Sequence, residues 1–230
     1  MRRSPRRLLL KLSGEAFGGD EGPIAAAPLN RITAEILSVE RVELALVVGG
    51  GNVIRGARTE MFDRIEADTL GMLATVLNAL ALRSRLEREG KKVVVQSAIH
   101  TELTDPISPR AARAALAEGA IVLFAGGTGS PLVTTDTAAA LRAVSIGADL
   151  LAKASNVPGV YSDDPAKTKD ASLLDEISHD EFMDHRYGVM DQVAVEICRE
   201  YALPIEVFDF ARTGALQDIA SGRRVGTRIG

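Results

Sequence analysis

Three apolar segments of this chain each lead directly into a turn that contains glycine. Segment 7–12 leads into Ser13-Gly14, segment 43–48 into Gly49-Gly50-Gly51, and segment 120–125 into Gly126-Gly127-Thr128-Gly129. An apolar strand that ends in a glycine turn and is followed by a helix is the repeating unit of parallel α/β sheets. No other feature of the sequence limits the fold as strongly.

The same alternation of strand and helix runs through the whole chain. Apolar runs predict strands at 7–12, 43–48, 92–96, 120–125, 149–153 and 205–208, and helical spacing predicts helices at 25–39, 63–89, 109–118, 136–146, 178–185, 190–202 and 214–221. We therefore expect an α/β fold, a three-layer αβα sandwich with a mainly parallel central sheet. The sequence shows no internal repeat and no linker, so we expect one domain over 1–230 with two lobes, roughly 1–150 and roughly 151–230.

Composition and charge argue against several classes of protein. The net charge of −4 disfavours general nucleic-acid binding, which needs a basic face. Cys198 is the only cysteine, so no intrachain disulfide forms, and its apolar helical surroundings predict a buried, unreactive thiol. No apolar run approaches the ~20 residues of a membrane span. The N-terminal apolar run is too short for a signal peptide. We expect a cytoplasmic protein without membrane or nucleic-acid partners.

The three glycine turns are suited to phosphate binding. Glycine lets the backbone approach a ligand closely, so that several N–H groups can face one phosphate, and the helix that follows adds positive potential. Glycine also serves ordinary tight turns, and one such turn alone would be weak evidence. Three of them at the carboxyl ends of strands, where open α/β sheets bind ligands, indicate a surface for several phosphates. The two common nucleotide signatures, the Walker pattern and Gly-x-Gly-x-x-Gly, are absent.

Lys11 and Lys153 end the first and fifth predicted strands. Phosphoryl transfer needs cations where negative charge spreads over the moving group, and these two lysines are placed to supply them. A lysine at the end of an apolar strand also reaches solvent in many proteins without any such role, and that alternative stays open for each lysine alone.

The remaining candidate ligands carry weaker signals. His100, His179 and His185 lack the spacing of metal ligands, so we expect surface or structural roles for them. The pair Asp163-Asp164 would suit a cation, but it also begins a plain turn before a proline.

The glycine turns and the segments around them resemble the bacterial uridylate kinases of the amino acid kinase superfamily. The matching motifs are Lys11-Leu12-Ser13-Gly14-Glu15, Gly49-Gly50-Gly51-Asn52-Val53-Ile54-Arg55-Gly56, Asp68-Thr69-Leu70-Gly71-Met72-Leu73-Ala74-Thr75, Gly126-Gly127-Thr128-Gly129-Ser130-Pro131-Leu132-Val133-Thr134-Thr135-Asp136, Lys153-Ala154-Ser155-Asn156-Val157, Gly159-Val160-Tyr161-Ser162-Asp163-Asp164-Pro165 and Val189-Met190-Asp191. They span nearly the whole chain in order, so the resemblance is specific.

The resemblance implies a fold, a reaction and roles for matching residues. It implies an amino acid kinase-like fold with an acceptor lobe (1–150) and an ATP lobe (151–230), transfer of the γ-phosphoryl group of ATP to UMP, Mg²⁺ with the ATP, and a homo-hexamer. ATP would be held by Lys11, Leu12, Ser13, Gly14, Gly51, Arg55, Ser155, Asn156, Tyr161 and Asp164. UMP would be held by Gly50, Asp68, Thr128, Gly129, Ser130, Pro131, Leu132, Val133, Thr134 and Thr135. No residue is assigned as a resident metal ligand.

Four residues would carry the transfer itself. Lys11 and Lys153 would neutralise the moving phosphoryl group, and Asp136 and Asp191 would orient these lysines or the Mg²⁺. Each aspartate also has a simpler interpretation as the N-cap of the helix that follows it. A cap and a functional carboxylate are not exclusive.

Four positions depart from the family's pattern. Pro158 stands where the family has aspartate, Ser130 replaces asparagine, and Leu132-Val133 replaces two phenylalanines. Two other functions remain as alternatives: a kinase of the same fold with a carboxylate or another small phosphate as acceptor, and a nucleotide-binding or storage protein that has lost transfer.

Overall fold

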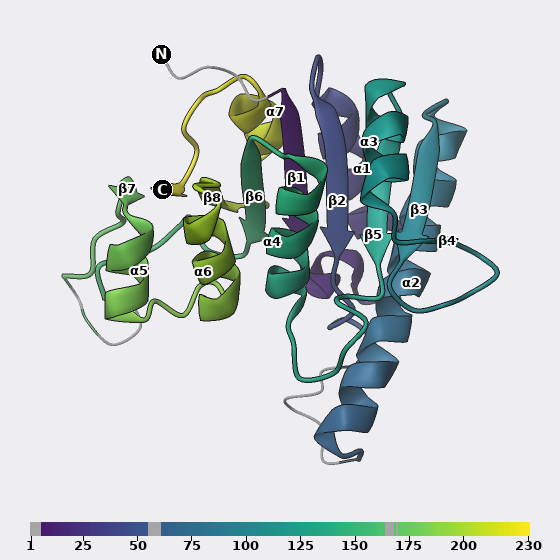
Figure 1. Cartoon of the computed structure of the whole chain (residues 1–230), viewed down its shortest axis with the longest axis horizontal. Coiled ribbons are helices and arrows are strands. Elements are labelled where there is room, and N and C mark those ends of the chain that lie inside the picture. Colours follow the sequence, from purple (N-terminus) through teal and green to yellow (C-terminus); the bar gives the residue numbers. More distant parts are fainter. Residues whose placement is uncertain (1–5, 55–60, 164–167, 169) are drawn as a thin grey trace.

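The computed structural model describes residues 6–54, 61–163, 168 and 170–230. Across these residues one sheet of nine strands runs through the molecule, in the order β4-β3-β5-β2-β1-β6-β8-β9-β7 (Figure 1). The strands are β1 (Arg7–Leu12), β2 (Glu43–Val48), β3 (Val93–Ser97), β4 (Asp105–Pro106), β5 (Ile121–Ala125), β6 (Leu150–Ser155), β7 (Glu176–Ile177), β8 (Ile205–Asp209) and β9 (Thr227–Ile229). All pairs are parallel except β8 with β9.

Helices cover both faces of this sheet. They are η1 (Gly14–Phe17), α1 (Ala26–Ser38), α2 (Arg64–Arg88), α3 (Pro109–Ala117), α4 (Thr135–Ile146), α5 (His179–His185), α6 (Gln192–Glu200) and α7 (Ala215–Ala220). Helices α1, α2 and α7 pack on one face, and α3, α4, α5 and α6 pack on the other. The predicted three-layer αβα sandwich is therefore confirmed.

Alternation along the strands divides the core into two clusters. In β1, Leu8, Leu10 and Leu12 join the cluster under α1, α2 and α7, whereas Leu9 joins the cluster under α3 to α6. The side chains of a strand point to opposite faces in turn, so a strand covered on both faces is apolar throughout. Lys11 shares the face of Leu9, which is the face that α4 covers.

The predicted strands and helices are all present, and no end is shifted by more than two residues. Three strands were not predicted: β4 and β7 have two residues each and β9 has three. Strands this short carry too few residues to show a period-two pattern. The antiparallel β9 extends the sheet beyond β8, and its residue Thr227 proves important for one loop of the site.

Helix α2 is the single described helix that is long and apolar enough, by length and composition, to cross a membrane. The expectation that no segment approaches this length is thus wrong for α2. Its C-terminal half packs on the sheet, with Ala79, Leu82 and Leu86 fully buried, whereas its N-terminal part projects beyond the sheet (Figure 1). A core helix passes such a test as readily as a membrane span, and 39% of the apolar window is buried here.

Candidate functional site

Lys11 and Lys153 lie side by side at the carboxyl edge of the sheet. Strands β1 and β6 are parallel neighbours, and their register pairs Lys11 with Lys153. Both side chains point to the face covered by α4, because each lysine lies two residues after a leucine (Leu9 and Leu151) of the cluster on that face. The two lysines are only 7% and 8% exposed, so neither reaches freely into solvent. The alternative of solvent-reaching lysines is therefore wrong.

The carboxylate of Asp136 forms ion pairs with the ammonium groups of both Lys11 and Lys153. Lys11 Nζ lies 2.9 Å from Asp136 Oδ1, and Lys153 Nζ donates a hydrogen bond to Asp136 Oδ2. Asp136 lies in the first turn of α4, but the N-cap is Thr134, whose hydroxyl accepts from Thr137 N. The interpretation of Asp136 as a helix cap is therefore wrong.

Charge and burial shift the pKa values of this cluster in opposite directions. Burial raises the pKa of the Asp136 carboxyl, but the ammonium groups of Lys11 and Lys153 outweigh it and hold the pKa well below its usual range. Burial lowers the pKa of Lys153, and Asp136 opposes that shift without cancelling it. The cluster therefore holds one carboxylate between two cations, with positive charge in excess.

Asp191 connects α6 to this cluster. Its Oδ1 accepts from Val193 N, so the predicted N-cap role is confirmed. Its Oδ2 accepts from the hydroxyls of Thr134 and Thr137 at 2.6 and 2.8 Å, and its backbone N–H donates to Asp136 Oδ2 at 3.3 Å. Asp191 thus fixes the first turn of α4, which carries Asp136.

The first two glycine turns are interlocked through their backbones. A Cβ on Gly14 would lie 2.4 Å from Gly51 N and 2.6 Å from Asn52 Oδ1. Distances this short exclude any side chain at position 14, so glycine is required there by close approach. The third turn needs glycine for another reason as well, because Gly126 has a φ of +74°.

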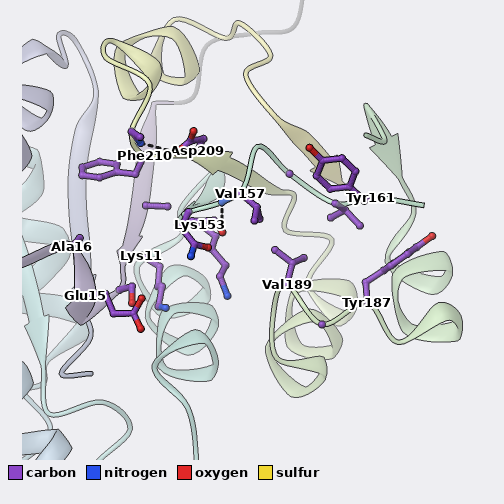
Figure 2. A pocket seen from close by; sticks show the side chains of 18 of the residues that line it. Lys11, Glu15, Ala16, Lys153, Val157, Tyr161, Tyr187, Val189, Asp209 and Phe210 are labelled. Carbon is purple, nitrogen blue, oxygen red and sulfur yellow. Dashed lines mark hydrogen bonds between the residues drawn. The ribbon is translucent and has the colours of Figure 1, made fainter. Parts of the chain in front are cut away.

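A cavity of about 1070 Å³, hereafter the larger cavity, opens beside the two lysines (Figure 2). Figure 2 shows Lys11 and Lys153 on one side of it and Tyr161, Tyr187 and Val189 on the other. Its lining is Lys11, Ser13, Glu15, Ala16, Arg31, Lys153, Ala154, Ser155, Asn156, Val157, Gly159, Val160, Tyr161, Ser162, Asp163, His185, Arg186, Tyr187, Gly188, Val189, Asp209, Phe210 and Ala211. The two lysine ammonium groups therefore lie at one end of the cavity, and Tyr161, Tyr187 and Val189 lie at the other (Figure 2).

A second cavity of about 330 Å³, hereafter the smaller cavity, adjoins the larger one, since Glu15 lines both. Its lining is Glu15, Gly50, Gly51, Ile54, Arg64, Ala67, Asp68, Gly71, Met72, Thr75, Gly127, Ser130, Val133, Thr134 and Thr135. Asp68 Oδ2 accepts from Leu132 N at 2.9 Å and from Arg64 Nε at 2.8 Å, which ties loop 128–134 to α2. Leu132 has a φ of +67°, a strained value for leucine, and this hydrogen bond holds it there.

The two cavities gather most of the residues singled out in the sequence. Lys11, Ser13, Lys153, Ser155, Asn156 and Tyr161 line the larger cavity. Gly50, Asp68, Ser130, Val133, Thr134 and Thr135 line the smaller one, together with Gly51. Leu12 is buried in the core, and Thr128, Gly129, Pro131 and Leu132 belong to the loop beside the smaller cavity without lining it. Arg55 and Asp164 lie outside the described residues.

Sequence reasoning missed part of the wall of the larger cavity. Tyr187 and Val189 come from the connection between α5 and α6, and Phe210 follows β8. His185, expected only at the surface or in a structural role, also lines this cavity and stacks on Tyr187 with the rings 8° from parallel. Of these wall residues, Phe210 alone could have been predicted, because it follows the carboxyl end of β8, which neighbours β6 in the parallel part of the sheet. Pro158 is exposed and is not part of the lining.

The described residues contain no cluster of three or more His, Cys, Asp or Glu side chains able to hold a metal ion. Both carboxylate oxygens of Asp136 already bond lysine. A divalent cation at this site would therefore have to take most of its oxygen ligands from a bound phosphate and water, as Mg²⁺ does.

The sequence and the structure both match known proteins over nearly their full length. A family model described as "Amino acid kinase family" matches residues 6–209. "Uridylate kinase" from Methylococcus capsulatus is 48% identical, over 97% of this chain and 96% of the relative, and "Uridylate kinase" from Alcanivorax borkumensis is 45% identical, over 99% and 93%. The crystal structure of UMP kinase from Bacillus anthracis matches with a TM-score of 0.95 at 36% identity, covering 99% of this chain and 97% of that one. That of UMP kinase from Ureaplasma parvum matches with a TM-score of 0.90 at 30% identity, covering both chains completely.

Proposed function

Because this chain belongs to the amino acid kinase family, we propose that its two adjoining cavities hold a phosphoryl donor and a phosphate acceptor, ATP and UMP. The chain is an ATP-dependent UMP kinase, which converts ATP and UMP into ADP and UDP for pyrimidine nucleotide synthesis. The observation that carries this function is the pair of buried lysines beside the point where the two cavities meet.

The larger cavity is the donor site in this proposal. Its lysine end takes the phosphates of ATP, with the N–H groups of the turn at Ser13, which lines the cavity, and at Gly14, which we assign on the resemblance of its motif. Its aromatic end takes the adenine and ribose against Tyr161, and Ser155 and Asn156 supply polar contacts. We also assign Leu12 (through its backbone), Gly51, Arg55 and Asp164 to the donor site on the resemblance of their motifs, and the last two lie outside the described residues.

The smaller cavity is the acceptor site. Its size suits one nucleoside monophosphate better than a triphosphate, and Gly50 and Gly127 bring two glycine turns to its wall. Asp68 is suited to accept hydrogen bonds from the ribose hydroxyls; the hydrogen bonds that it accepts from the described residues Arg64 and Leu132 both end on Oδ2, so we assign the ribose to Oδ1. The loop Thr128, Gly129, Ser130, Pro131, Leu132, Val133, Thr134 and Thr135 closes this site.

The transfer itself needs little covalent chemistry from the protein. A phosphate oxygen of UMP attacks the γ-phosphorus of ATP, a new P–O bond forms, and the bond to the bridging oxygen breaks with its electron pair passing to ADP. Lys11 and Lys153 neutralise the charge that spreads over the moving group, and Asp136 keeps them in place before the substrates arrive. Asp191 keeps Asp136 in place in turn. Mg²⁺ enters as part of the MgATP substrate.

We propose further that the enzyme acts in the cytoplasm as a homo-oligomer, a hexamer by resemblance. Ile65, Leu73 and Leu77 form an apolar stripe on the outer side of α2 and are each about half exposed (55%, 49% and 54%). An exposed apolar stripe of this kind fits a contact between protein copies. The two lobes, 1–150 and 151–230, form one domain, since the larger cavity takes residues from both.

ADP release tests the proposed function. Purified protein is supplied with ATP, Mg²⁺ and one acceptor from a panel of UMP, CMP, dTMP, AMP, GMP, N-acetylglutamate and aspartate. Turnover should be strong with UMP and weak with every other acceptor. Turnover with a different acceptor alone would support the related kinase of altered specificity, and ATP binding without any turnover would support the storage protein.

A further inference from the structure

Helix α2 carries two buried polar side chains that the proposed reaction does not use directly. Thr75 is 2% exposed and Asn78 is fully buried. They lie three residues apart and therefore on the same side of the helix. Each bonds to the backbone of a different glycine turn of the acceptor site.

Thr75 holds the third glycine turn. Its hydroxyl accepts a hydrogen bond from Gly126 N at 2.6 Å and donates one to Met72 O at 2.7 Å. Gly126 begins the turn that brings Gly127 to the wall of the smaller cavity. The direction of the Gly126 peptide is therefore set from α2.

Asn78 holds the second glycine turn at both ends. Its amide nitrogen donates to Gly49 O at 2.7 Å and to Asn52 Oδ1 at 2.8 Å, and its oxygen accepts from Asn52 Nδ2 at 2.9 Å. The turn between them carries Gly50, which abuts the helix so closely that a Cβ there would lie 2.3 Å from Gly71 O. Neither end of this turn can move without breaking a bond to Asn78.

We propose that Thr75 and Asn78 are positioning residues that fix the spacing of the two glycine turns around the phosphate of the acceptor. Gly50 and Gly127 follow different strands, β2 and β5. Because Thr75 and Asn78 lie one turn apart on the rigid helix α2, their hydrogen bonds set the distance between these two glycines. The acceptor phosphate then meets N–H groups that are already placed, which matters because misplacing a reacting group by about 1 Å costs about 100-fold in rate. The inference rests on the proposed UMP site.

The first test is Thr75→Val, which keeps the shape of the side chain and removes the acceptor of Gly126 N–H. The KM for UMP should rise about tenfold, because the turn at Gly126 is no longer held in place around the acceptor phosphate, whereas the KM for ATP should stay within about twofold. Thr75→Ser keeps the hydroxyl and should restore the KM for UMP. Asn78→Ser should act in the same direction as Thr75→Val, through the other turn.

Thr33→Val is the matched control. Thr33 is 3% exposed and its hydroxyl donates to Leu29 O within α1, away from both cavities. The Thr33→Val variant therefore also loses a buried hydroxyl, but one that makes no hydrogen bond to a glycine turn. Its KM values for UMP and ATP should equal those of the wild type.

The outcomes separate the inference from the function on which it rests. Wild-type protein that makes no UDP would contradict the proposed function. Wild-type protein that makes UDP, together with Thr75→Val and Asn78→Ser variants of unchanged KM for UMP, would overturn the inference, and so would an equal rise in both KM values. If Thr75→Val does not fold, Asn78→Ser, checked by its Tm and by calorimetric binding of UMP alone, decides the question in the same way.

Discussion

The ammonium of Lys11 lies 2.9 Å from Oδ1 of Asp136, and both side chains are about nine-tenths buried. The other carboxylate oxygen bonds Lys153, so one carboxylate orients two cations from neighbouring strands. A buried charge is costly unless it is paired, and here two ammonium groups share the carboxylate of Asp136. Both ammonium groups can therefore also attract the anionic phosphoryl group when the substrates bind.

Asp136→Asn should therefore damage both catalysis and folding. Without the carboxylate, two buried ammonium groups repel each other, which should cost about 3–5 kcal/mol in the free energy of unfolding. The kcat should fall by about 100-fold or more, because the cations are no longer fixed for the transition state. Denaturant unfolding and steady-state kinetics measure the two effects. A variant of wild-type kcat would show that the lysines do not need Asp136.

Lys153→Ala should lower kcat far more than it weakens ATP binding. The charge of Lys153 counts most when the phosphoryl group is in transit, so kcat should fall by about 100- to 1000-fold while the Kd for ATP changes about threefold. Lys92→Ala is the control, because Lys92 forms an exposed ion pair with Glu118 away from both cavities. Equal losses in kcat and in ATP affinity would mean that Lys153 only anchors the bound nucleotide.

Activity should decline at high pH before the protein unfolds. Burial lowers the pKa of Lys153 in the free protein below its ordinary value of 10.5, so kcat/KM should fall on an alkaline limb centred below pH 10.5. Between the folded and unfolded pKa values the unfolded chain binds more protons than the folded one, so the contribution of Lys153 to the free energy of unfolding rises with pH. Between pH 7 and pH 10.5, steady-state kinetics should therefore show activity falling, while denaturant unfolding should show no matching loss from Lys153 in the free energy of unfolding. A kcat/KM that stays flat to pH 10.5 would contradict the role of this ammonium.

Asp68→Asn should raise the KM for UMP about tenfold and leave the KM for ATP nearly unchanged, since the amide accepts ribose hydrogen bonds more weakly than the carboxylate. Glu66→Gln, an exposed change on the same helix, is the control and should have no effect. An effect confined to ATP would show that the donor and acceptor cavities are reversed.

The central strands and both lysines could be predicted because their signal is local. A run of apolar residues followed by glycine marks a strand end, and the two lysines sit at such ends. The two lysines lie opposite each other because β1 and β6 are neighbouring strands, and this strand order could not be predicted from the sequence. The third member, Asp136, was recognised from its motif, but its bonds to both lysines depend on how α4 packs.

The far wall of the larger cavity could not be predicted, because it is assembled from distant segments. Tyr187 and Val189 reach the cavity only because α6 packs on α4 and α5 packs on α6. Thr227 offers another case. From the short strand β9 it accepts a hydrogen bond from Val160 N at 2.8 Å, and so holds the loop that carries Tyr161. A strand of three residues is too short for its sequence pattern to predict such a contact.

The most direct measurement of the central claim is the formation of UDP from UMP and ATP labelled in its γ-phosphate. Purified wild-type protein should place the label in the β-phosphate of UDP, and the Lys153→Ala protein should do so at a rate at least about 100-fold lower. The absence of labelled UDP with folded wild-type protein, or equal labelling by both proteins, would contradict the account.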